Sequence, residues 1–152
     1  MFRGFQTLNL DSKGRLAMPS KYRERLSAEE SGEMIVTMSI KKCLEIHPLS
    51  EWEEVERKLL ALPTFDKNSR LVRDLYFNSQ HEVKLDAGGR ILVPQVLRDR
   101  IGLDKSVVLS GQGKKFELWD EPVWSARFGE VVAQVENIDW ESVSPELAAL
   151  SL

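Results

Sequence analysis

Apolar and polar residues alternate over short stretches in both halves of the chain, a pattern typical of half-buried β-strands. The alternating apolar residues are Leu8 and Leu10 in the first half, and Val83 and Leu85 in the second. A four-residue turn with Asp first and Gly last follows each stretch, at 11–14 and at 86–89. Second strands are predicted at 15–18 and 90–93. Each half is therefore expected to begin as a β-hairpin.

A short helix is predicted after each hairpin, because a proline suits the first helical turn, where a missing N–H costs little. These helices are expected to end near Leu26 and Ile101. Further strands are predicted at 34–38 and 44–47 in the first half, and at 107–110 and 116–119 in the second. Each half thus reads as two strands, a short helix and two more strands.

Helical periodicity appears between the two halves and after the second one. Ser50 and Glu53 have the spacing of a capping box, and Asp66 is expected to cap the next helix. After the second half, an apolar stripe of helical spacing runs through Trp124, Phe128, Val131, Val132 and Val135. Trp52 and Trp124, both near predicted helix starts, are expected to anchor the core.

The two halves are copies of one unit. LDSKGRLAMPSKYRERL (10–26) and LDAGGRILVPQVLRDRI (85–101) align without a gap and agree at seven of 17 positions. The matched residues are Leu10, Asp11, Gly14, Arg15, Pro19, Arg23 and Arg25, which recur as Leu85, Asp86, Gly89, Arg90, Pro94, Arg98 and Arg100. Further on, Glu45 and Trp52 fall on Glu117 and Trp124. The chain is predicted to contain two homologous repeats.

Composition excludes several classes of protein. The chain has 152 residues, 42% of them hydrophobic, which is enough for a packed core. A single cysteine, Cys43, cannot form an internal disulfide, so a cytoplasmic protein is expected. Only His47 and His81 could join it as soft metal ligands, and no pair has zinc spacing, so no metal or other cofactor is expected. Nucleotide-binding and hydrolase motifs are missing, which argues against an enzyme. No apolar run approaches the roughly 18 residues that a membrane span needs.

Charge is distributed unevenly along the chain. The formal net charge is −3, yet residues 1–25 carry six basic against two acidic residues, a balance of +4. Residues 117–152 carry eight acidic residues against one arginine, a balance of −7. The acidic average therefore does not exclude nucleic acid, because the basic residues are concentrated at one end.

DNA contact is the chemistry that the first turn and its surroundings favour, since arginine can bridge two acceptors on a phosphate or a guanine. The expected DNA-contacting residues are Arg15, Lys13, Asp11, Arg3, Arg90 and Asp86. The first repeat should dominate, because Gly88 stands where the first turn has Lys13. A structural reading is the alternative: Asp caps its own turn and Arg pairs with it locally. Arg23 and Arg25 also remain open between a structural role and DNA contact.

The opening MFRGFQTLNLDSKGRLAMPSKYRERL, followed by LDAGGRILVPQVLR and GQGKKFELWDEPVW, resembles the MraZ family of bacterial transcriptional regulators over essentially the whole chain. The DxxxR motif of that family falls on Asp11–Arg15 and Asp86–Arg90. The resemblance implies an α+β fold in which two tandem SpoVT-AbrB-like repeats form a pseudo-symmetric β-barrel with helical extensions. The implied division is 5–52 and 81–124 for the repeats, 53–80 for a helical linker and 125–152 for a C-terminal helical extension.

The resemblance also implies a function and its partners. Members of the family bind double-stranded DNA as ring-shaped homo-oligomers, at direct repeats upstream of the operon for cell division and cell wall synthesis, which includes their own gene. They generally repress that operon and are cytoplasmic and nucleoid-associated. Two alternatives remain open: a structural ring that holds other proteins without DNA contact, and an antitoxin-like regulator, which would require a toxin partner.

Overall fold

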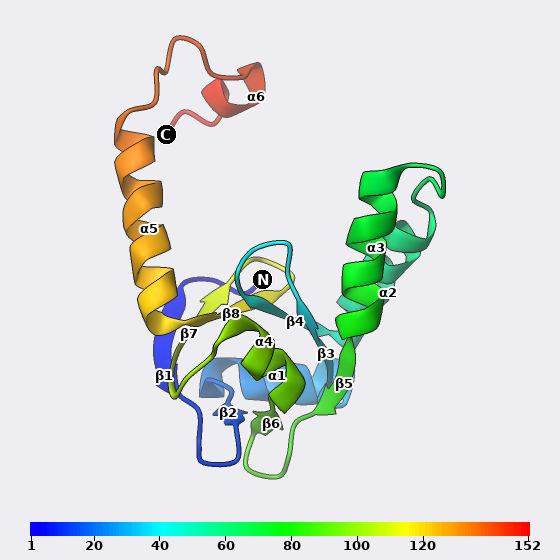
Figure 1. The fold of residues 1–152 in the computed structure, drawn as a ribbon. Coiled ribbons are helices and arrows are strands. Elements are labelled where there is room, and N and C mark those ends of the chain that lie inside the picture. The colour runs from blue at the N-terminus through cyan, green and yellow to red at the C-terminus, as the bar shows by residue number, and fades with distance from the viewer. The chain divides into compact units, whose positions relative to one another are not determined.

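The chain is described over residues 1–152, the side chain of Glu30 excepted, by a computed structural model. It forms two compact units, Met1–Glu121 and Pro122–Leu152 (Figure 1). In chain order the first unit contains β1 (Phe5–Asn9), β2 (Arg15–Ala17), α1 (Ser20–Glu30), β3 (Glu33–Met38), β4 (Leu44–Pro48), α2 (Leu49–Leu60), α3 (Lys67–Ser79), β5 (His81–Lys84), β6 (Arg90–Leu92), α4 (Gln95–Ile101), β7 (Ser106–Gly111) and β8 (Phe116–Asp120). These elements confirm the predicted α+β fold.

Strands from both repeats interleave in one antiparallel sheet of six, in the order β1-β7-β8-β4-β3-β5. In this order each strand lies as far from the midpoint of the sheet, between β8 and β4, as its counterpart from the other repeat does on the opposite side. The counterparts are β8 and β4, β7 and β3, and β1 and β5. The remaining two strands, β2 and β6, form a separate antiparallel pair, here called the β2–β6 ribbon. The repeats are therefore related by an internal two-fold. Closure of the sheet into a barrel stays a prediction.

The predicted hairpins are wrong, because the strands on either side of each turn do not pair with each other. β1 pairs with β7, and β2 pairs with β6, each from the other repeat. Alternation identifies the two faces of a strand but not its partner. Pairing β2 with β6 sets Leu16 opposite Ile91, and both side chains are fully buried. The exchange thus lets both repeats contribute to a single core.

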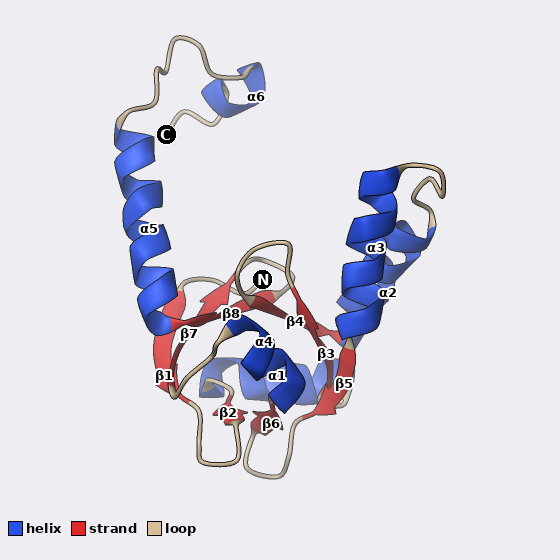
Figure 2. Cartoon of the chain, in the orientation of Figure 1, coloured by secondary structure: helices blue, strands red, loops and turns tan.

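The main core lies between the six-stranded sheet, the β2–β6 ribbon and the helices α1 and α4, which lie across the space between them (Figure 2). Leu26 of α1 and Leu97 of α4 are buried there. Helix α4 ends at Ile101 as predicted, but α1 continues past the expected Leu26 to Glu30. A left-handed residue, Ser31 at φ 53°, follows α1.

Helices α2 and α3 pack on β3 around a second cluster, made of Ile35, Trp52, Leu59 and Tyr76. Trp52 is buried, as predicted for a core anchor. The Asp66 cap is also confirmed, since its carboxylate accepts a hydrogen bond from the Ser69 backbone N–H at 2.9 Å. The predicted capping box at Ser50 is wrong. Helix α2 begins at Leu49 with Pro48 in the cap position, which places Ser50 inside the first turn.

The second unit contains α5 (Glu121–Glu136) apart from its first residue, a helix predicted from its apolar stripe, and α6 (Pro145–Ala148). The expectation that Trp124 anchors the core is wrong: it is half-buried, and no residue of α5 is buried. Its ring stacks on Phe128, one helical turn later, at 5.0 Å between centroids. Among the helices of the described residues, none is long and apolar enough to cross a membrane.

Candidate nucleic-acid interface

The turn of the first repeat holds Arg15 in a fixed orientation through the carboxylate of Asp11. One carboxylate oxygen of Asp11 accepts hydrogen bonds from the backbone N–H groups of Arg15 (2.8 Å) and Lys13 (3.0 Å), and the other accepts from Arg15 Nε (2.6 Å). The backbone hydrogen bond from Arg15 is the main cause that lowers the pKa of Asp11 below its usual value. Asp11 therefore stays charged and orients the guanidinium, whose Nη groups make no hydrogen bond among the described residues.

The turn of the second repeat has the same geometry. One oxygen of Asp86 accepts from the backbone N–H groups of Gly88 and Arg90, both at 2.9 Å, and the other accepts from Arg90 Nε at 3.2 Å. The backbone hydrogen bond from Arg90 likewise lowers the pKa of Asp86. The turns differ in charge, because the lysine of the first is a glycine in the second.

Each turn is braced by an arginine from the helix of the other repeat. Arg23 of α1 donates through Nε to the Met18 carbonyl at 2.5 Å, and its side chain lies against Gly89. Arg98 of α4 makes the matching hydrogen bond to the Val93 carbonyl at 3.0 Å and lies against Gly14. These contacts give Arg23 and its counterpart a structural role, one of the two readings that the sequence leaves open.

The other arginine of α1 turns away from this brace. Arg25 pairs with Glu29 one turn later, with 3.2 Å between Arg25 Nε and Glu29 Oε2, and its guanidinium lies 4.5 Å from the centroid of the Phe2 ring. It therefore packs against the N-terminal segment as a half-buried cation over an aromatic face.

The outer face of the β2–β6 ribbon carries both DxxxR arginines. Its side chains alternate, so that Leu16 and Ile91 point into the core and Arg15, Ala17, Arg90 and Leu92 form the outer face. The two turns lie at the same end of the first unit, beside the ribbon (Figure 1). Backbone hydrogen bonds from Met18 to Gly89 and from Val93 to Gly14, both 3.0 Å, tie each ribbon strand to the turn of the other repeat.

Five of the six predicted DNA-contacting residues are brought together on this ribbon and its turns: Asp11, Lys13, Arg15, Asp86 and Arg90. Arg3 is not. Its backbone is hydrogen-bonded to the Tyr22 hydroxyl, and the neighbouring Phe2 pairs with Gly113 in the turn between β7 and β8. The whole of β1 lies between Arg3 and Asp11. The structure thus defines one compact basic surface without the N-terminal arginine.

Comparison with known proteins identifies the family. A family model described as "MraZ protein, putative antitoxin-like" matches residues 1–75 and again residues 76–143. The chain belongs to the MraZ family. The Transcriptional regulator MraZ of Halorhodospira halophila is 46% identical over 153 residues, with both chains fully covered.

Other relatives agree with this assignment. The Transcriptional regulator MraZ of Nitrosococcus oceani is 45% identical over 153 residues and all of both chains. That of Thioalkalivibrio sulfidiphilus is 50% identical over 124 residues, which make up 82% of this chain and 83% of the relative. The family resemblance drawn from the DxxxR motifs is confirmed, and the MraZ relatives carry the name of transcriptional regulators.

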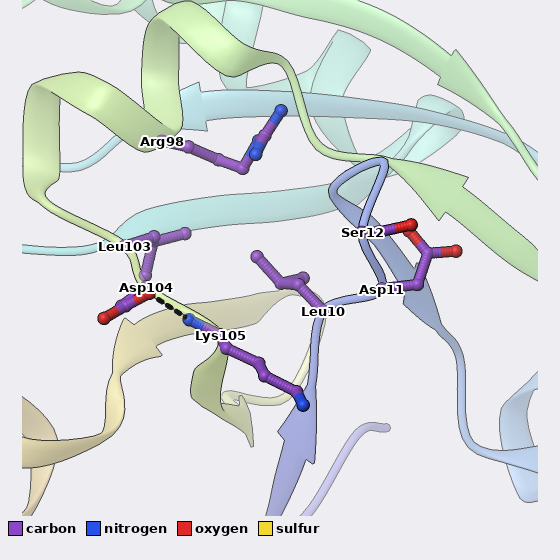
Figure 3. A pocket seen from close by; sticks show the side chains of 7 residues that line it. All are labelled: Leu10, Asp11, Ser12, Arg98, Leu103, Asp104 and Lys105. Atoms are coloured by element: carbon purple, nitrogen blue, oxygen red, sulfur yellow. Dashed lines mark hydrogen bonds between the residues drawn. The ribbon is translucent and has the colours of Figure 1, made fainter.

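A pocket of about 430 Å³ opens beside the first DxxxR turn (Figure 3). Its lining residues are Leu10, Asp11, Ser12, Arg98, Leu103, Asp104 and Lys105. Both carboxylates in the wall are already engaged: Asp11 by its own turn, and Asp104 by the Lys105 backbone N–H at 2.8 Å. The first turn therefore borders a hollow whose wall includes its own brace, Arg98.

A buried pair of carboxylates, Glu45 and Glu117, lies at the midpoint of the six-stranded sheet, and the sequence did not single it out as functional. The two residues lie directly opposite each other on β4 and β8. Lys115 lies 3.2 Å from Glu45, and Lys41 lies 2.8 Å from Glu117, so each carboxylate is paired with a lysine of the other repeat. The one sequence signal for this carboxylate pair is the repeat alignment, which matches Glu45 with Glu117.

Further hydrogen bonds saturate this pair. Glu45 accepts from the Tyr76 hydroxyl at 2.9 Å and contacts His47 Nε2 at 2.9 Å, and Glu117 accepts from Trp119 Nε1 at 3.1 Å. Burial raises the pKa of Glu45, but the hydrogen bond to His47 and the nearby Lys115 lower it overall, to about 2. The group is a charged, fully partnered element of the fold.

Proposed function

We propose that this MraZ-family chain regulates transcription by binding double-stranded promoter DNA through the outer face of the β2–β6 ribbon and its two flanking turns. The observation that carries the proposal is the paired DxxxR geometry. In both turns the aspartate holds the Nε of the arginine, which leaves the terminal nitrogens for an outside acceptor. A two-stranded ribbon fits the major groove, where arginine can bridge two acceptors of guanine.

The first repeat dominates this contact. Lys13 and Lys21 belong to it, and the second repeat has Gly88 and Val96 at the equivalent positions. Asp11 and Asp86 act as positioning residues, because their oxygens are already used within their own turns. A ribbon of this size neutralises only a few phosphates, so one subunit binds weakly and in a salt-dependent manner.

Assembly into a ring-shaped homo-oligomer supplies the missing affinity in this proposal. Successive subunits engage direct repeats upstream of the operon for cell division and cell wall synthesis, including the chain's own gene, and repress it. Each later contact is intramolecular, so avidity rises by roughly 10²–10⁴ without any new type of contact. In the same proposal the chain acts in the cytoplasm on nucleoid DNA, needs no cofactor and performs no catalysis.

Loss of one arginine tests the proposal. Arg15→Ala should weaken binding to the upstream region of the chain's own gene by about 5- to 150-fold, because a bidentate arginine contributes ~1–3 kcal/mol. The measurement is a fluorescence-anisotropy titration at one fixed salt concentration, with random DNA of equal length as the reference. Arg57→Ala is the matched control, since Arg57 is an exposed arginine on α2 paired with Glu54.

The outcome also separates this function from its rival. Unchanged affinity of a folded Arg15→Ala protein removes the proposed role of Arg15. If the unaltered chain forms oligomers yet binds its own upstream DNA no better than random DNA, it is a structural assembly protein and not a DNA-binding regulator.

A further inference from the structure

The outer face of the β2–β6 ribbon is apolar at one end, which the arginines do not explain. Leu92 lies directly opposite Arg15, and its side chain is 54% exposed. The core does not require it, because the neighbouring Ile91 and Val93 are the residues of this strand region that are fully buried. A large apolar side chain thus stands exposed next to the principal arginine of the proposed DNA surface.

The internal two-fold shows that this feature belongs to one repeat only. The counterparts of Leu92 and Val96 in the first repeat are Ala17 and Lys21. Val96 is also 54% exposed. At these two positions the first repeat thus has a small alanine and a charged lysine, whereas the second repeat has two larger apolar side chains, although both halves share the same backbone pairing.

Apolar side chains have one kind of partner in the major groove, the C5-methyl group of thymine. A thymine methyl can be buried by a leucine only if a neighbouring group fixes the ribbon in the groove, and Arg15 lies opposite Leu92 to do so. Resting on the proposed function, we propose that Leu92 is a specificity-determining residue that contacts a thymine methyl beside the base or phosphate bound by Arg15. The occupant of this apolar face is thus duplex DNA, in agreement with the cations around it.

Removal of the methyl group from the DNA, and of the leucine from the protein, tests the contact as a double-mutant cycle. The probe is the upstream region of the chain's own gene, either with thymine or with deoxyuridine in place of every thymine of one direct repeat. The unaltered chain should bind the deoxyuridine DNA about fourfold more weakly, the loss expected when the single methyl group that Leu92 buries is removed. Leu92→Ala should bind thymine DNA more weakly and should not distinguish the two DNAs.

Two further variants control for side-chain loss. Leu92→Met keeps an apolar side chain and should retain discrimination, whereas Leu60→Ala removes an equally exposed leucine on α2 (60%) and should leave both affinities unchanged. Light scattering should give the same mass for all variants.

Other results would contradict the proposed contact between Leu92 and a thymine methyl. Equal discrimination by Leu92→Ala, or specific binding by the unaltered chain that ignores the methyl groups, overturns the leucine contact and leaves the proposed function intact. A change in mass for Leu92→Ala also overturns it, since Leu92 would then cover another subunit. Absence of specific binding by the unaltered chain overturns both.

Discussion

At the scale of single residues, Gly14 and Gly89 decide whether the two DxxxR turns can form. Both have positive φ, +81° and +74°, which favours glycine over residues with a Cβ. Both also lie under a guanidinium, so an added Cβ would collide with Arg98 at Gly14 and with Arg23 at Gly89. The same small residue therefore sets the turn conformation and admits the brace from the other repeat.

Gly14→Ala is expected to lower the free energy of unfolding by about 1–2 kcal/mol, the usual cost of a left-handed conformation for a residue with a Cβ. The Arg98 side chain must also shift, which disturbs its hydrogen bond to Val93. Urea-induced unfolding, followed by circular dichroism, measures the change.

Gly129→Ala provides the opposite control for this experiment. Gly129 lies inside α5, where an added Cβ meets no atom within 4 Å. Alanine there should raise the free energy of unfolding by about 0.5–1 kcal/mol. Gly14→Ala with unchanged stability would contradict the role given to the turn.

At the scale of elements, the meeting of β4 and β8 joins the two repeats through charge as well as through backbone pairing. Like charges directly opposite each other on neighbouring strands are normally destabilising. Here the exchange of lysines between repeats neutralises both carboxylates, Lys115 at Glu45 and Lys41 at Glu117. The stability of the sheet should therefore depend on pH.

The sign of that dependence follows from the pKa of Glu45, which is about 2 in the folded chain against an ordinary value of 4.5. Its charged form stabilises the folded state in full above pH 4.5, and the contribution is lost as the pH falls from 4.5 toward 2. The loss is on the order of 3 kcal/mol at most. Glu45→Gln should therefore lose less stability than the unaltered chain between pH 5 and pH 3, in urea unfolding at each pH.

An exposed carboxylate serves as the comparison for Glu45. Arg57 also lowers the pKa of Glu54, but that pair lies on the surface of α2, where ion pairs contribute little. Glu54→Gln should leave the pH profile unchanged. A Glu45→Gln profile that runs parallel to that of the unaltered chain would contradict the assignment.

The positions of the strands along the chain were more predictable than the pairing between strands. Alternation located the first strand of each half, and the other three were placed as short apolar segments in matching positions of the two repeats, because both signals depend only on local sequence. The partner of β2 was not predictable, since Leu16 is buried equally well by a hairpin or by pairing with the other repeat. The capping box at Ser50 failed because Pro48 already ends β4 and starts α2.

The candidate site shows the same limit. The DxxxR motifs identified Arg15 and Arg90 from the residues alone, since the turn and its arginine are consecutive in sequence. The braces by Arg23 and Arg98, and the separation of Arg3 from the turns, depend on how the two repeats cross. That crossing is a tertiary property that no local pattern contains.

At the scale of the whole molecule, the second unit presents an apolar helix face without a covering layer. Phe128, Val131, Val132 and Val135 are 43–47% exposed and follow one face of α5 at helical spacing. A contiguous exposed apolar stripe of this kind typically marks a contact surface. We expect it to contribute to the homo-oligomer that the proposed function requires.

The double variant Val131→Glu/Val135→Glu should lower the mass of the assembly, because two buried carboxylates would disfavour contact between copies. Light scattering measures the mass directly. Loss of assembly should also weaken binding to DNA with several direct repeats by roughly 10²-fold, through lost avidity. Ala133→Glu, on the other side of α5 and exposed, is the matched control and should assemble normally. Unchanged mass of the double variant would exclude this face.

The difference between Ala17 and Leu92 has a consequence for the operator itself. Proteins with exact two-fold symmetry read palindromes, because each half presents the same side chains to one half-site. The fusion of two repeats in one chain keeps the paired backbone and lets its halves differ, so the ribbon has a direction. A ribbon with two different halves needs no palindromic binding site. It should recognise a short base sequence in one defined orientation on the duplex. Inversion of one such site among several should remove the contact of one subunit.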